Sequence, residues 1–373
     1  MVEDLSAEAL AKADDSRWMR RALEHARRGL GRTTPNPIVG ACIVTSEGVV
    51  VGDGAHERAG EAHAEVHALE EAGARARGAT LYCTLEPCAH TGRTGPCTER
   101  IIAAGISRVV AAMEDPFPLV RGRGFAVLRE HGITVDTGVE REAALRLNQP
   151  FLTSVRDGRP FVTLKAATSL DGRIAAAAGE RTQLTSAAAA RHAHYHRAHV
   201  DAIAIGSGTL LTDDPLLTVR GIYRERPLAR VIFDRRLRAA PRLRVFSTLR
   251  VGPVIILTSL EARGAQPEHA AALEQAGATL VTVEGAAVAA GLCALAGLGI
   301  QSVLIEGGAE LHAAAWDEGV VDYVQLYVAP VNVGSQGVPF LDGRPFSTAS
   351  LIESTVTPLG PDVVIEGYVH RPH

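Results

Sequence analysis

Short runs of β-branched residues alternate along the chain with segments in which apolar residues recur at helical spacing. In the first part of the chain most of the helical segments end close to a glycine, which is a common place for a helix to stop. Because strands and helices alternate, we expect a layered α/β sheet. The pattern predicts strands at 38–45, 49–54, 79–85, 108–113 and 133–139, and helices at 18–29, 64–73, 97–105 and 124–131.

A second α/β pattern follows a cluster of helix- and strand-breaking residues at 148–160. This cluster contains Pro150, Gly158 and Pro160, and few regular elements are expected to continue through it. We therefore expect two domains, residues 1–149 and 150–373. Strands of the second domain are predicted at 161–167, 202–206, 230–233, 254–258, 279–283, 302–306 and 323–328, with helical spacing between several of them.

The composition agrees with two globular domains and narrows the kinds of partner. A chain of 373 residues corresponds to roughly two domains of about 150 residues, and 46% hydrophobic with 21% charged residues excludes disorder over most of the length. The net charge of −4 and the 4% aromatic content disfavour a nucleic-acid partner, which needs basic excess and stacking surfaces. No apolar run reaches the length of a membrane span and the first residues are charged, so we expect a cytoplasmic protein with no membrane partner.

The cysteines indicate metal or catalytic chemistry rather than a disulfide framework. There are five of them, an odd number in a long chain, which favours thiols that are buried, metal-bound or catalytic. Cys42, Cys83 and Cys293 stand outside any motif and are predicted to be core residues.

His63, Cys88 and Cys97 supply one imidazole and two thiolates, the ligand set of a zinc ion that keeps its fourth position for water. The histidine opens a predicted helix, and Cys88 follows a predicted strand. Glu65 lies two residues from the histidine and is not needed as a ligand. Its carboxylate can therefore take a proton from zinc-activated water and pass it to a ring nitrogen and then to a leaving amine, as hydrolytic deamination requires.

The pattern His-Ala-Glu at 63–65, followed by Pro-Cys at 87–88 and a further cysteine, resembles the zinc-dependent cytidine deaminase superfamily. The usual form has two residues between the cysteines, whereas 89–96 supply eight here, and this longer form resembles the deaminase of riboflavin biosynthesis. The segments 34–40 and 54–56 carry the same resemblance. It implies a cytidine-deaminase-like α/β/α sandwich in which the base or the phosphoribosyl arm is bound by Asn36, His56 and His90.

The second half lacks the Gly-x-Gly-x-x-Gly fingerprint that opens the usual nicotinamide-binding domain. It carries instead the segments 165–173, 206–220 and 305–311, which together resemble the reductase domain of the same pathway. This resemblance implies a dihydrofolate-reductase-like α/β domain that uses NADPH. The similarity to bifunctional deaminase/reductases of riboflavin biosynthesis thus covers nearly the whole chain, and it suggests a homo-oligomer.

Gly307 and Gly308 follow a predicted strand and are candidates for cofactor binding. Two glycines at this place would let backbone amides at a helix N-terminus approach a pyrophosphate. An ordinary strand-to-helix turn is the alternative interpretation of the pair. The resemblance implies that further cofactor contacts come from Ala167, Thr209 and Asp213.

Several charged residues of the second half are candidates for substrate binding. The resemblance implies that Arg197, Leu217, Arg220 and Glu306 hold the substrate. A guanidinium fork matches phosphate oxygens, so the two arginines suit a ribose phosphate. Lys165 and Asp171 are expected to orient or protonate the sugar, and the proton donor is left open.

Four histidines, at 192, 194, 196 and 199, fall in one predicted helix. His192 and His196 are one turn apart, a spacing that can grip a metal. The sequence offers no evident third ligand or carboxylate for them. We therefore predict a solvated helix face and no site.

The predicted function is that of a bifunctional enzyme acting on a small phosphorylated pyrimidine. The first half hydrolyses the 2-amino group of a diaminopyrimidinone ribosylamine 5′-phosphate with Zn²⁺, and the second half reduces the ribose to ribityl with NADPH. One alternative is a nucleic-acid deaminase fused to an unrelated cofactor domain, which the charge and aromatic content oppose. The other is a non-catalytic zinc module, which has no use for an unbound carboxylate such as Glu65.

Three positions depart from the family pattern. Phe117 stands where asparagine is usual, Gly95 replaces a proline between the cysteine ligands, and Gln183 occupies the place of an expected tryptophan near the nicotinamide. The first bears on the substrate loop and the last on cofactor affinity. None is a zinc ligand.

Overall fold

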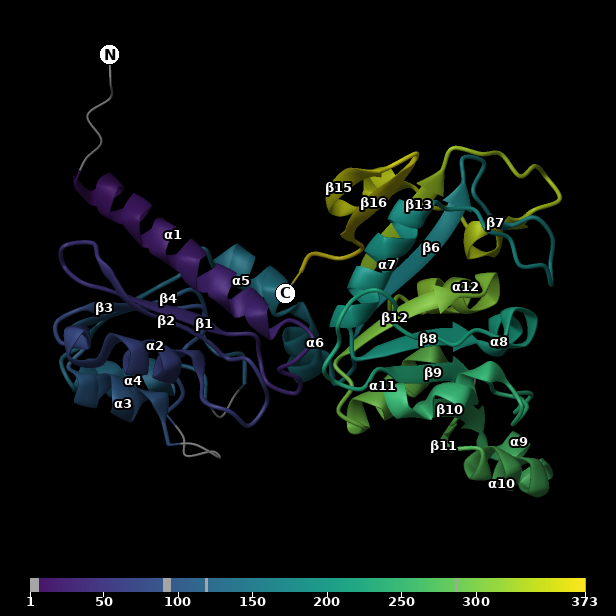
Figure 1. Cartoon of the computed structure of the whole chain (residues 1–373), viewed down its shortest axis with the longest axis horizontal. Helices are drawn as coiled ribbons and strands as arrows, with labels where there is room; N and C mark the ends of the chain where they lie inside the picture. The colour runs from purple at the N-terminus through teal and green to yellow at the C-terminus, as the bar shows by residue number, and fades with distance from the viewer. Residues whose placement is uncertain (1–6, 90–94, 118–119, 286, 373) are drawn as a thin grey trace, which may run out of the picture. The chain divides into compact units, whose positions relative to one another are not determined.

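The computed structural model describes residues 7–89, 95–117, 120–285 and 287–372, with side chains from Asp14 onward. Contacts between residues divide the chain into two compact units, one reaching Arg156 and the other running from Asp157 to Pro372. Both are α/β units, as the alternation of elements predicts (Figure 1).

The first unit is built on a five-stranded sheet with the strand order β2-β1-β3-β4-β5. β1 is antiparallel to both of its neighbours, whereas β3, β4 and β5 run parallel to one another. Every predicted strand of this half is present. The strands are β1 (Gly40–Val44), β2 (Val50–Ala55), β3 (Thr80–Cys83), β4 (Arg108–Ala111) and β5 (Thr134–Thr137).

Helices cover both faces of this sheet, so the α/β/α sandwich is confirmed (Figure 1). Glycines in the strands set the close approach. A Cβ on Gly40 would lie 2.0 Å from Ala22 O in α1, and a Cβ on Gly54 would lie 1.9 Å from Ala64 O in α2. The helices are α1 (Ala7–Ala26), α2 (Ala64–Ala72), α3 (Cys97–Ala104), α4 (Arg123–Glu130), α5 (Arg141–Leu147) and α6 (Gln149–Asp157).

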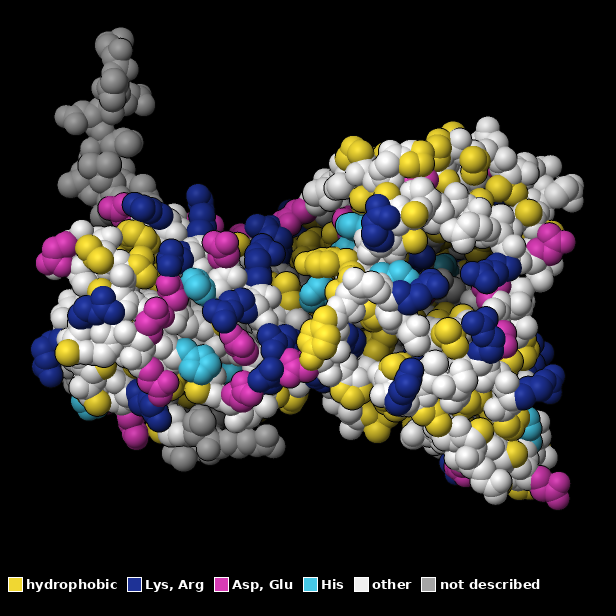
Figure 2. Space-filling model, in the orientation of Figure 1, with side chains coloured by type: hydrophobic (Ala, Val, Ile, Leu, Met, Phe, Trp, Pro, Cys, Tyr) yellow, Lys and Arg dark blue, Asp and Glu magenta, His cyan; other side chains and the backbone are white. Residues whose placement is uncertain are grey.

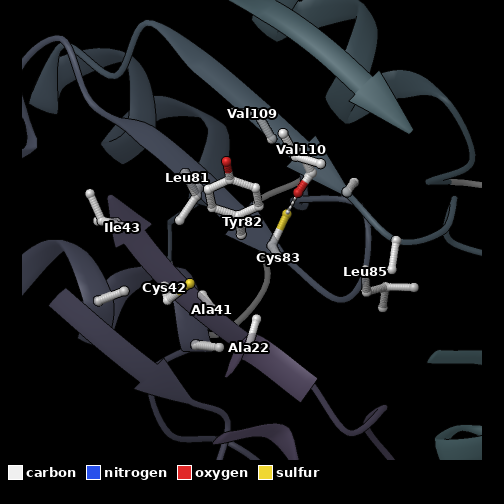
Figure 3. Close-up of a cluster of buried hydrophobic side chains, with 14 of the residues drawn as sticks. Ala22, Ala41, Cys42, Ile43, Leu81, Tyr82, Cys83, Leu85, Val109 and Val110 are labelled. Carbon is white, nitrogen blue, oxygen red and sulfur yellow. Dashed lines mark hydrogen bonds between the residues drawn. The ribbon is translucent and has the colours of Figure 1, made fainter. Parts of the chain in front are cut away.

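Aliphatic side chains and two thiols fill the interior of the first unit. Figure 3 shows Ile43, Leu81 and Val109 projecting from adjacent strands beside Cys42 and Cys83. Both cysteines are buried, as predicted for core residues. The prediction is wrong for the third unassigned cysteine, because Cys293 lies exposed on a helix of the second unit.

The second unit contains a nine-stranded sheet with the order β11-β10-β9-β8-β12-β6-β13-β16-β15. All neighbours are parallel except β16, which is antiparallel to β13 and to β15. The strands are β6 (Phe161–Ser169), β8 (Ala202–Gly206), β9 (Ala229–Phe233), β10 (Val254–Ser259), β11 (Ala278–Val283), β12 (Ser302–Gly307), β13 (Tyr323–Ala329), β15 (Ile352–Leu359) and β16 (Asp362–Tyr368).

Helices pack against different parts of this sheet. α12 contacts β8 and β12 near its centre, α9 and α10 lie near β11, and α7 contacts β15 and β16. A short ribbon of β7 (Arg173–Ala175) and β14 (Val338–Pro339) stands apart from the main sheet. The helices are α7 (Ala187–His199), α8 (Ser207–Asp213), α9 (Leu260–Ala265), α10 (Pro267–Gln275), α11 (Val288–Gly297) and α12 (Ala309–Asp317).

Two expectations from the sequence need correction. The breaker cluster at 148–160 does not interrupt regular structure, since α6 runs through most of it. Pro150 is the second residue of that helix, where a missing N–H costs no intrahelical hydrogen bond. The strands β15 and β16 escaped prediction, and the burial pattern explains the first: β15 is almost wholly exposed, so it lacks the apolar alternation that marks a strand.

None of the helices in the described part of the chain combines the length and apolar character needed to cross a bilayer.

Candidate active sites

The first site is organised around the N-terminus of α2. His63 is the residue that caps this helix, with extended backbone angles of φ −76° and ψ 162°, and Glu65 lies in its first turn. The helix can press against β2 because Gly54 has no side chain; a Cβ there would overlap Ala64 O. The strand glycine thus fixes the height of the histidine and the glutamate above the sheet.

Cys88 and Cys97 are brought together by the loop that follows β3 and by the start of α3. Cys97 is the first residue of the helix, and its backbone N–H donates to Cys88 Sγ at 3.3 Å. The backbone N–H of Thr98 donates to Cys88 O at 3.2 Å. The helix N-terminus therefore holds the loop cysteine in place through two backbone donors.

The three side chains converge with the spacing that one tetrahedral ion requires. His63 Nδ1 lies 3.2 Å from Cys97 Sγ and 3.6 Å from Cys88 Sγ, and the ligand atoms of all three residues lie within 4.8 Å of one another. Tetrahedral zinc with usual bond lengths separates a nitrogen from a sulfur ligand by about 3.6 Å. The Cys97 thiol and the His63 imidazole lower the pKa of the Cys88 thiol, which favours the thiolate that binds metal.

Glu65 is buried beside these ligands with an unsatisfied carboxylate. Its Oε2 has no hydrogen-bond partner among the described residues, and burial raises the pKa of the carboxyl above its ordinary value. Within the described part of the chain, the group of potential ligands here consists of His63, Cys88 and Cys97 only. Three ligands among the described residues, with an unpaired carboxylate oxygen next to them, are the arrangement of a catalytic rather than a structural zinc site.

Asn36 and His56, which are predicted to bind the base or the phosphoribosyl arm, lie together beside this centre. The His56 ring packs edge-on against the His63 ring with 5.4 Å between centroids. His56 Nδ1 lies 3.1 Å from Ala62 O, so it carries the proton and donates, while Nε2 accepts from Asn36 Nδ2 at 3.0 Å. The predicted contribution of His90 falls outside the described residues.

Glu86 and Asn148 position this site and were missed from the sequence. The buried Glu86 carboxylate accepts hydrogen bonds from the backbone N–H groups of Asp115, Gly122 and Gly124 at 3.1, 2.9 and 2.9 Å, which fixes the loop directly before Cys88. The Asn148 side chain bonds both backbone groups of Ile38, at 2.7 and 2.9 Å, and so holds the segment that carries Asn36. Glu86 stands immediately before the Pro-Cys pair, a signal that could have been used.

Two of the three residues that depart from the family pattern lie in the first unit, and both are exposed. Phe117 is 44% exposed, and Gly95 is exposed with open space around the position of a Cβ. In the second unit, the Gln183 side chain donates to Thr185 O at 2.9 Å. None of these contacts involves a member of the zinc-binding group.

The second unit gathers Lys165, Arg197 and Glu306 at neighbouring strands β6 and β12 and at α7. Arg197 Nε donates to Glu306 Oε1 at 2.6 Å, and its Nη2 donates to the other carboxylate oxygen. Burial by itself would raise the pKa of Glu306, but Arg197 and Lys165 outweigh it and lower the pKa to about 2. Burial also lowers the pKa of Lys165, whose Nζ lies 5.5 Å from the centre of the Tyr327 ring.

Arg220 lies against His194 rather than against a carboxylate. The backbone N–H and the Nε of Arg220 lie 3.2 and 3.1 Å from the two ring nitrogens of His194. Burial and the nearby Arg197 and Arg220 charges lower the pKa of His194 to about 4, so its ring is neutral at pH 7 and leaves the charge of Arg220 uncompensated. Leu217, three residues before Arg220, is buried and has a φ of 51°.

Thr209 meets the glycine pair at the start of α12. A Cβ on Gly307 would lie 2.9 Å from Thr209 Cγ2, and Gly308 has a φ of 88° that favours glycine. Asp213, the last residue of α8, is partly buried, which raises the pKa of its carboxyl. Ala167 packs elsewhere, against the cluster formed by α7 and Tyr327.

Asp171 holds a turn. Its carboxylate accepts hydrogen bonds from Ser169, Val333 and Gly334, none of which is a candidate site residue. That carboxylate accepts from Ser169 Oγ at 2.6 Å and from the backbone N–H groups of Val333 and Gly334 at 3.0 and 2.7 Å. These hydrogen bonds lower the pKa of Asp171 well below its ordinary value. The structure thus gives Asp171 a role in fixing the turn after β6.

The histidines of α7 do not form the solvated face that the sequence predicted. His194 is buried, the other three are half-buried, and the exposed side of the helix carries Arg191 and Tyr195. Histidines show in cyan over α7 in Figure 2. A carboxylate, Glu366, also joins His192 and His196. It was missed because it lies on β16, a strand that the pattern did not predict.

Comparison with known proteins agrees with this description of two sites. A model of the cytidine and deoxycytidylate deaminase zinc-binding region matches residues 12–113, and a model of the RibD C-terminal domain matches residues 160–365. The riboflavin biosynthesis protein RibD of Bacillus amyloliquefaciens is 42% identical over 93% of this chain and 94% of its own length. The chain belongs to the RibD family.

Other RibD proteins are similar over almost the same span. RibD of Escherichia coli K12 is 42% identical over 86% of this chain and 89% of its own. The Acinetobacter baumannii RibD structure superposes with a TM-score of 0.84 at 36% identity, covering 96% of this chain and 99% of that one. A Thermotoga maritima diaminohydroxyphosphoribosylaminopyrimidine deaminase/5-amino-6-(5-phosphoribosylamino)uracil reductase gives 0.83 at 35% identity with the same coverage. The bifunctional deaminase/reductase architecture is therefore confirmed, with a zinc-binding deaminase unit and a dihydrofolate-reductase-like unit.

Proposed function

We propose that the first unit deaminates 2,5-diamino-6-(5-phosphoribosylamino)pyrimidin-4-one and that the second unit then reduces the ribosyl side chain of the product to ribityl with NADPH. The observation that carries the proposal is the convergence of His63, Cys88 and Cys97 beside the unpaired, buried carboxylate of Glu65. The name of the Thermotoga maritima relative, a diaminohydroxyphosphoribosylaminopyrimidine deaminase, supports the substrate class.

In the deaminase unit, His63, Cys88 and Cys97 hold the zinc ion, which when bound supplies a water molecule of lowered pKa. Glu65 is placed to take one proton from the attacking water and pass it to the ring nitrogen, and then to carry the second proton of the same oxygen to the amino group, which leaves as ammonia while the ring carbonyl forms. Burial keeps bulk water from competing for this carboxylate. The coupled pair Asn36 and His56 offers side-chain hydrogen bonds to the pyrimidine.

In the reductase unit, Thr209, Gly307 and Gly308 form the proposed NADPH contact, with Asp213 and Ala167 as further candidates. NADPH supplies a hydride to C1 of the sugar. Arg220 is the better placed of the two arginines for the 5′-phosphate, because its partner His194 is neutral. Arg197 is already paired with Glu306, so this pair is proposed to orient the sugar or base together with Lys165 and Leu217.

The remaining parts of the proposal concern the cellular setting. Five free cysteines, two of them zinc ligands, and the use of NADPH fit a reducing cytoplasm. A homo-oligomer is proposed from the family resemblance.

The test supplies the diaminopyrimidine ribosylamine phosphate and follows ammonia release and NADPH oxidation in one cuvette. Ammonia is expected without NADPH, and NADPH oxidation is expected only after ammonia has appeared. The deaminated intermediate alone should support NADPH oxidation at once. Oxidation of NADPH that precedes ammonia release would contradict the proposed order.

The role of Arg220 can be tested in the same assay with the deaminated intermediate. Arg220→Ala is expected to raise KM, to leave kcat within a few-fold, and to abolish the weakening of binding by added salt. An unchanged KM would remove Arg220 from the phosphate site. Arg191→Ala on the exposed side of α7 is the matched control and should change neither constant.

A further inference from the structure

A second group of metal-ligating side chains lies in the reductase unit, apart from the deaminase centre. His192 and His196 lie on successive turns of α7, their rings contact Tyr327 and Gln325 of β13, and Glu366 of β16 lies beside them. The ligand atoms of these three residues lie within 4.8 Å of one another, as do those of the deaminase group. In the described part of the chain these are the two groups of three or more such residues that come this close.

The distances are close to those of a bound ion. His196 Nε2 and Glu366 Oε1 are 3.8 Å apart. Two such ligands on a tetrahedral zinc ion are separated by about 3.3 Å, so a movement of about half an ångström would bring them onto one ion. The two imidazole rings are already adjacent, with 4.6 Å between their centroids.

The surrounding residues orient both rings for binding through the same nitrogen. His192 Nδ1 lies 2.9 Å from the hydroxyl of Tyr327, and His196 Nδ1 lies 2.8 Å from the side-chain amide of Gln325. Both contacts engage the nitrogen nearer the backbone, which leaves Nε2 of each ring as the metal ligand. In histidines that ligate metals, the ring nitrogen that does not bind the metal is typically hydrogen-bonded in this way.

Gln325 gives an independent sign that the group is incomplete. Its Oε1 is buried and has no hydrogen-bond partner among the described residues, while its Nε2 lies 2.8 Å from both His196 Nδ1 and Glu366 Oε1. A metal-bound His196 must carry its proton on Nδ1. Rotation of the Gln325 amide would then let Oε1 accept a hydrogen bond from this N–H, so the unpaired oxygen gains a donor. Glu366 gives up its hydrogen bond from Gln325 when it turns to the ion.

We propose that His192, His196 and Glu366 form a second metal site, which takes a divalent cation of the zinc class through two imidazoles and one carboxylate. Three protein ligands leave a further position for water. The site differs from the deaminase centre in having no sulfur ligand. Ligands of this type accept Zn²⁺, Co²⁺ and Ni²⁺ readily.

Metal at this site would act on the reductase residues through α7. Arg197 follows His196 directly and bonds Glu306, and the Tyr327 ring that supports His192 faces the Lys165 ammonium. Ligation joins α7 to β16 by a metal bridge. The metal is therefore a positioning element that fixes Arg197 and Lys165 relative to each other.

The test measures metal content of the tag-free full chain after removal of metal by a chelator and reloading with Zn²⁺ or Co²⁺. The wild-type chain is expected to retain two equivalents through gel filtration. Glu366→Gln and His196→Gln should each retain one, and Cys97→Ser should also retain one, held at the second site. His199→Gln changes a histidine of the same helix whose Nδ1 bonds Tyr195 O, and it should retain two.

Cobalt distinguishes the two sites by their ligands. Co²⁺ in the deaminase centre gives sulfur-to-metal charge-transfer absorption, whereas the second site gives only the weaker visible bands of nitrogen and oxygen ligation. Cys97→Ser should therefore lose the charge-transfer absorption and keep the visible bands of the second site, whereas Glu366→Gln should keep the charge-transfer absorption. Tyr327→Phe, which removes a supporting hydrogen bond, should weaken the second site about 10- to 100-fold. A single equivalent in the wild-type chain, or two in Glu366→Gln, would overturn the proposal.

Discussion

The two candidate active sites differ in how their buried polar groups are partnered. The deaminase unit brings together two sulfur atoms, one imidazole and a Glu65 oxygen. That oxygen has no hydrogen-bond partner among the described residues. In the reductase unit, the charges of Arg197 and Glu306 already compensate each other, and Arg220 bonds the neutral ring of His194. The first site has the ligand set of a metal ion, whereas the polar groups of the second already have partners within the unit.

This difference predicts how each site fails. A site built around an ion and one proton carrier should lose its chemistry when that carrier is changed, while its fold persists. A site built from compensating charges should lose stability when one partner is removed, because the other remains buried without a counter-charge. The predictions that follow separate these two outcomes.

The largest effect is expected for Glu65→Gln. The amide cannot take the proton of the attacking water, so ammonia release should fall about 10²- to 10⁴-fold. Zinc content should be unchanged, and NADPH oxidation with the deaminated intermediate should continue. Glu61→Gln, an exposed neighbour, should leave ammonia release intact. Full deaminase activity in Glu65→Gln would contradict the role of Glu65 as the proton carrier.

The second effect concerns stability and should appear in the reductase unit alone. Glu306→Gln leaves the Arg197 guanidinium largely buried without its counter-charge, so the free energy of unfolding of this unit should fall by about 3–5 kcal/mol. Urea unfolding followed by Trp316 fluorescence in a Trp18→Phe background reports this unit. Asp317→Asn breaks the exposed Asp317–Arg344 pair and should leave the free energy of unfolding nearly unchanged, because solvent screens this pair. Equal losses in the two variants would contradict the argument.

The Arg197–Glu306 pair should also make the stability of the reductase unit depend on pH. The pKa of Glu306 is lowered to about 2 in the folded chain, against about 4.3 in an unfolded one. The carboxylate therefore contributes its stability above about pH 4.3, and that contribution is lost as pH falls toward 2. Glu306→Gln should flatten this part of the stability profile, whereas Asp317→Asn should leave the part due to Glu306 in place.

The sequence predicted the deaminase site better than the reductase site for a physical reason. His63, Glu65, Cys88 and Cys97 sit at starts of helices and in one loop, and their chemistry follows from residue type and short spacing. Glu306 and Arg197 lie far apart in the chain, and their pairing depends on the order of strands in a nine-stranded sheet. No local pattern contains that order.

Other features that the sequence did not predict share this cause. The histidines of α7 were expected to face solvent because β15 and β16 were not predicted, and it is this hairpin that α7 packs against. The role of Asp171 in holding a turn depends on Val333 and Gly334, which are distant in sequence. Glu86 was overlooked although it stands beside a zinc ligand, since its partners are backbone groups of a later loop.

A smaller effect is expected at the packing of α2 on β2. Gly54→Ala places a Cβ 1.9 Å from Ala64 O, and relief requires the start of α2 to move away from the sheet. Overpacking of this kind costs about 1–3 kcal/mol. Because the movement carries His63 and Glu65 with it, kcat for ammonia release should fall together with zinc affinity. Gly264→Ala, with open space around its Cβ, is the control and should preserve both.

The smallest effect is a change in the alkaline side of the reductase pH profile. Burial lowers the pKa of Lys165, so its ammonium loses a proton at a lower pH than an exposed lysine, for which the value is about 10.4. If the ammonium orients the sugar, kcat/KM should decline as pH rises through this lowered pKa. Arginine stays charged over the whole range, so Lys165→Arg should remove the decline even where it reduces the maximal rate. The same decline in both proteins would assign it to another group. Ammonia release by the deaminase unit should show no difference between the two proteins, which confines the effect to the site whose charges compensate each other.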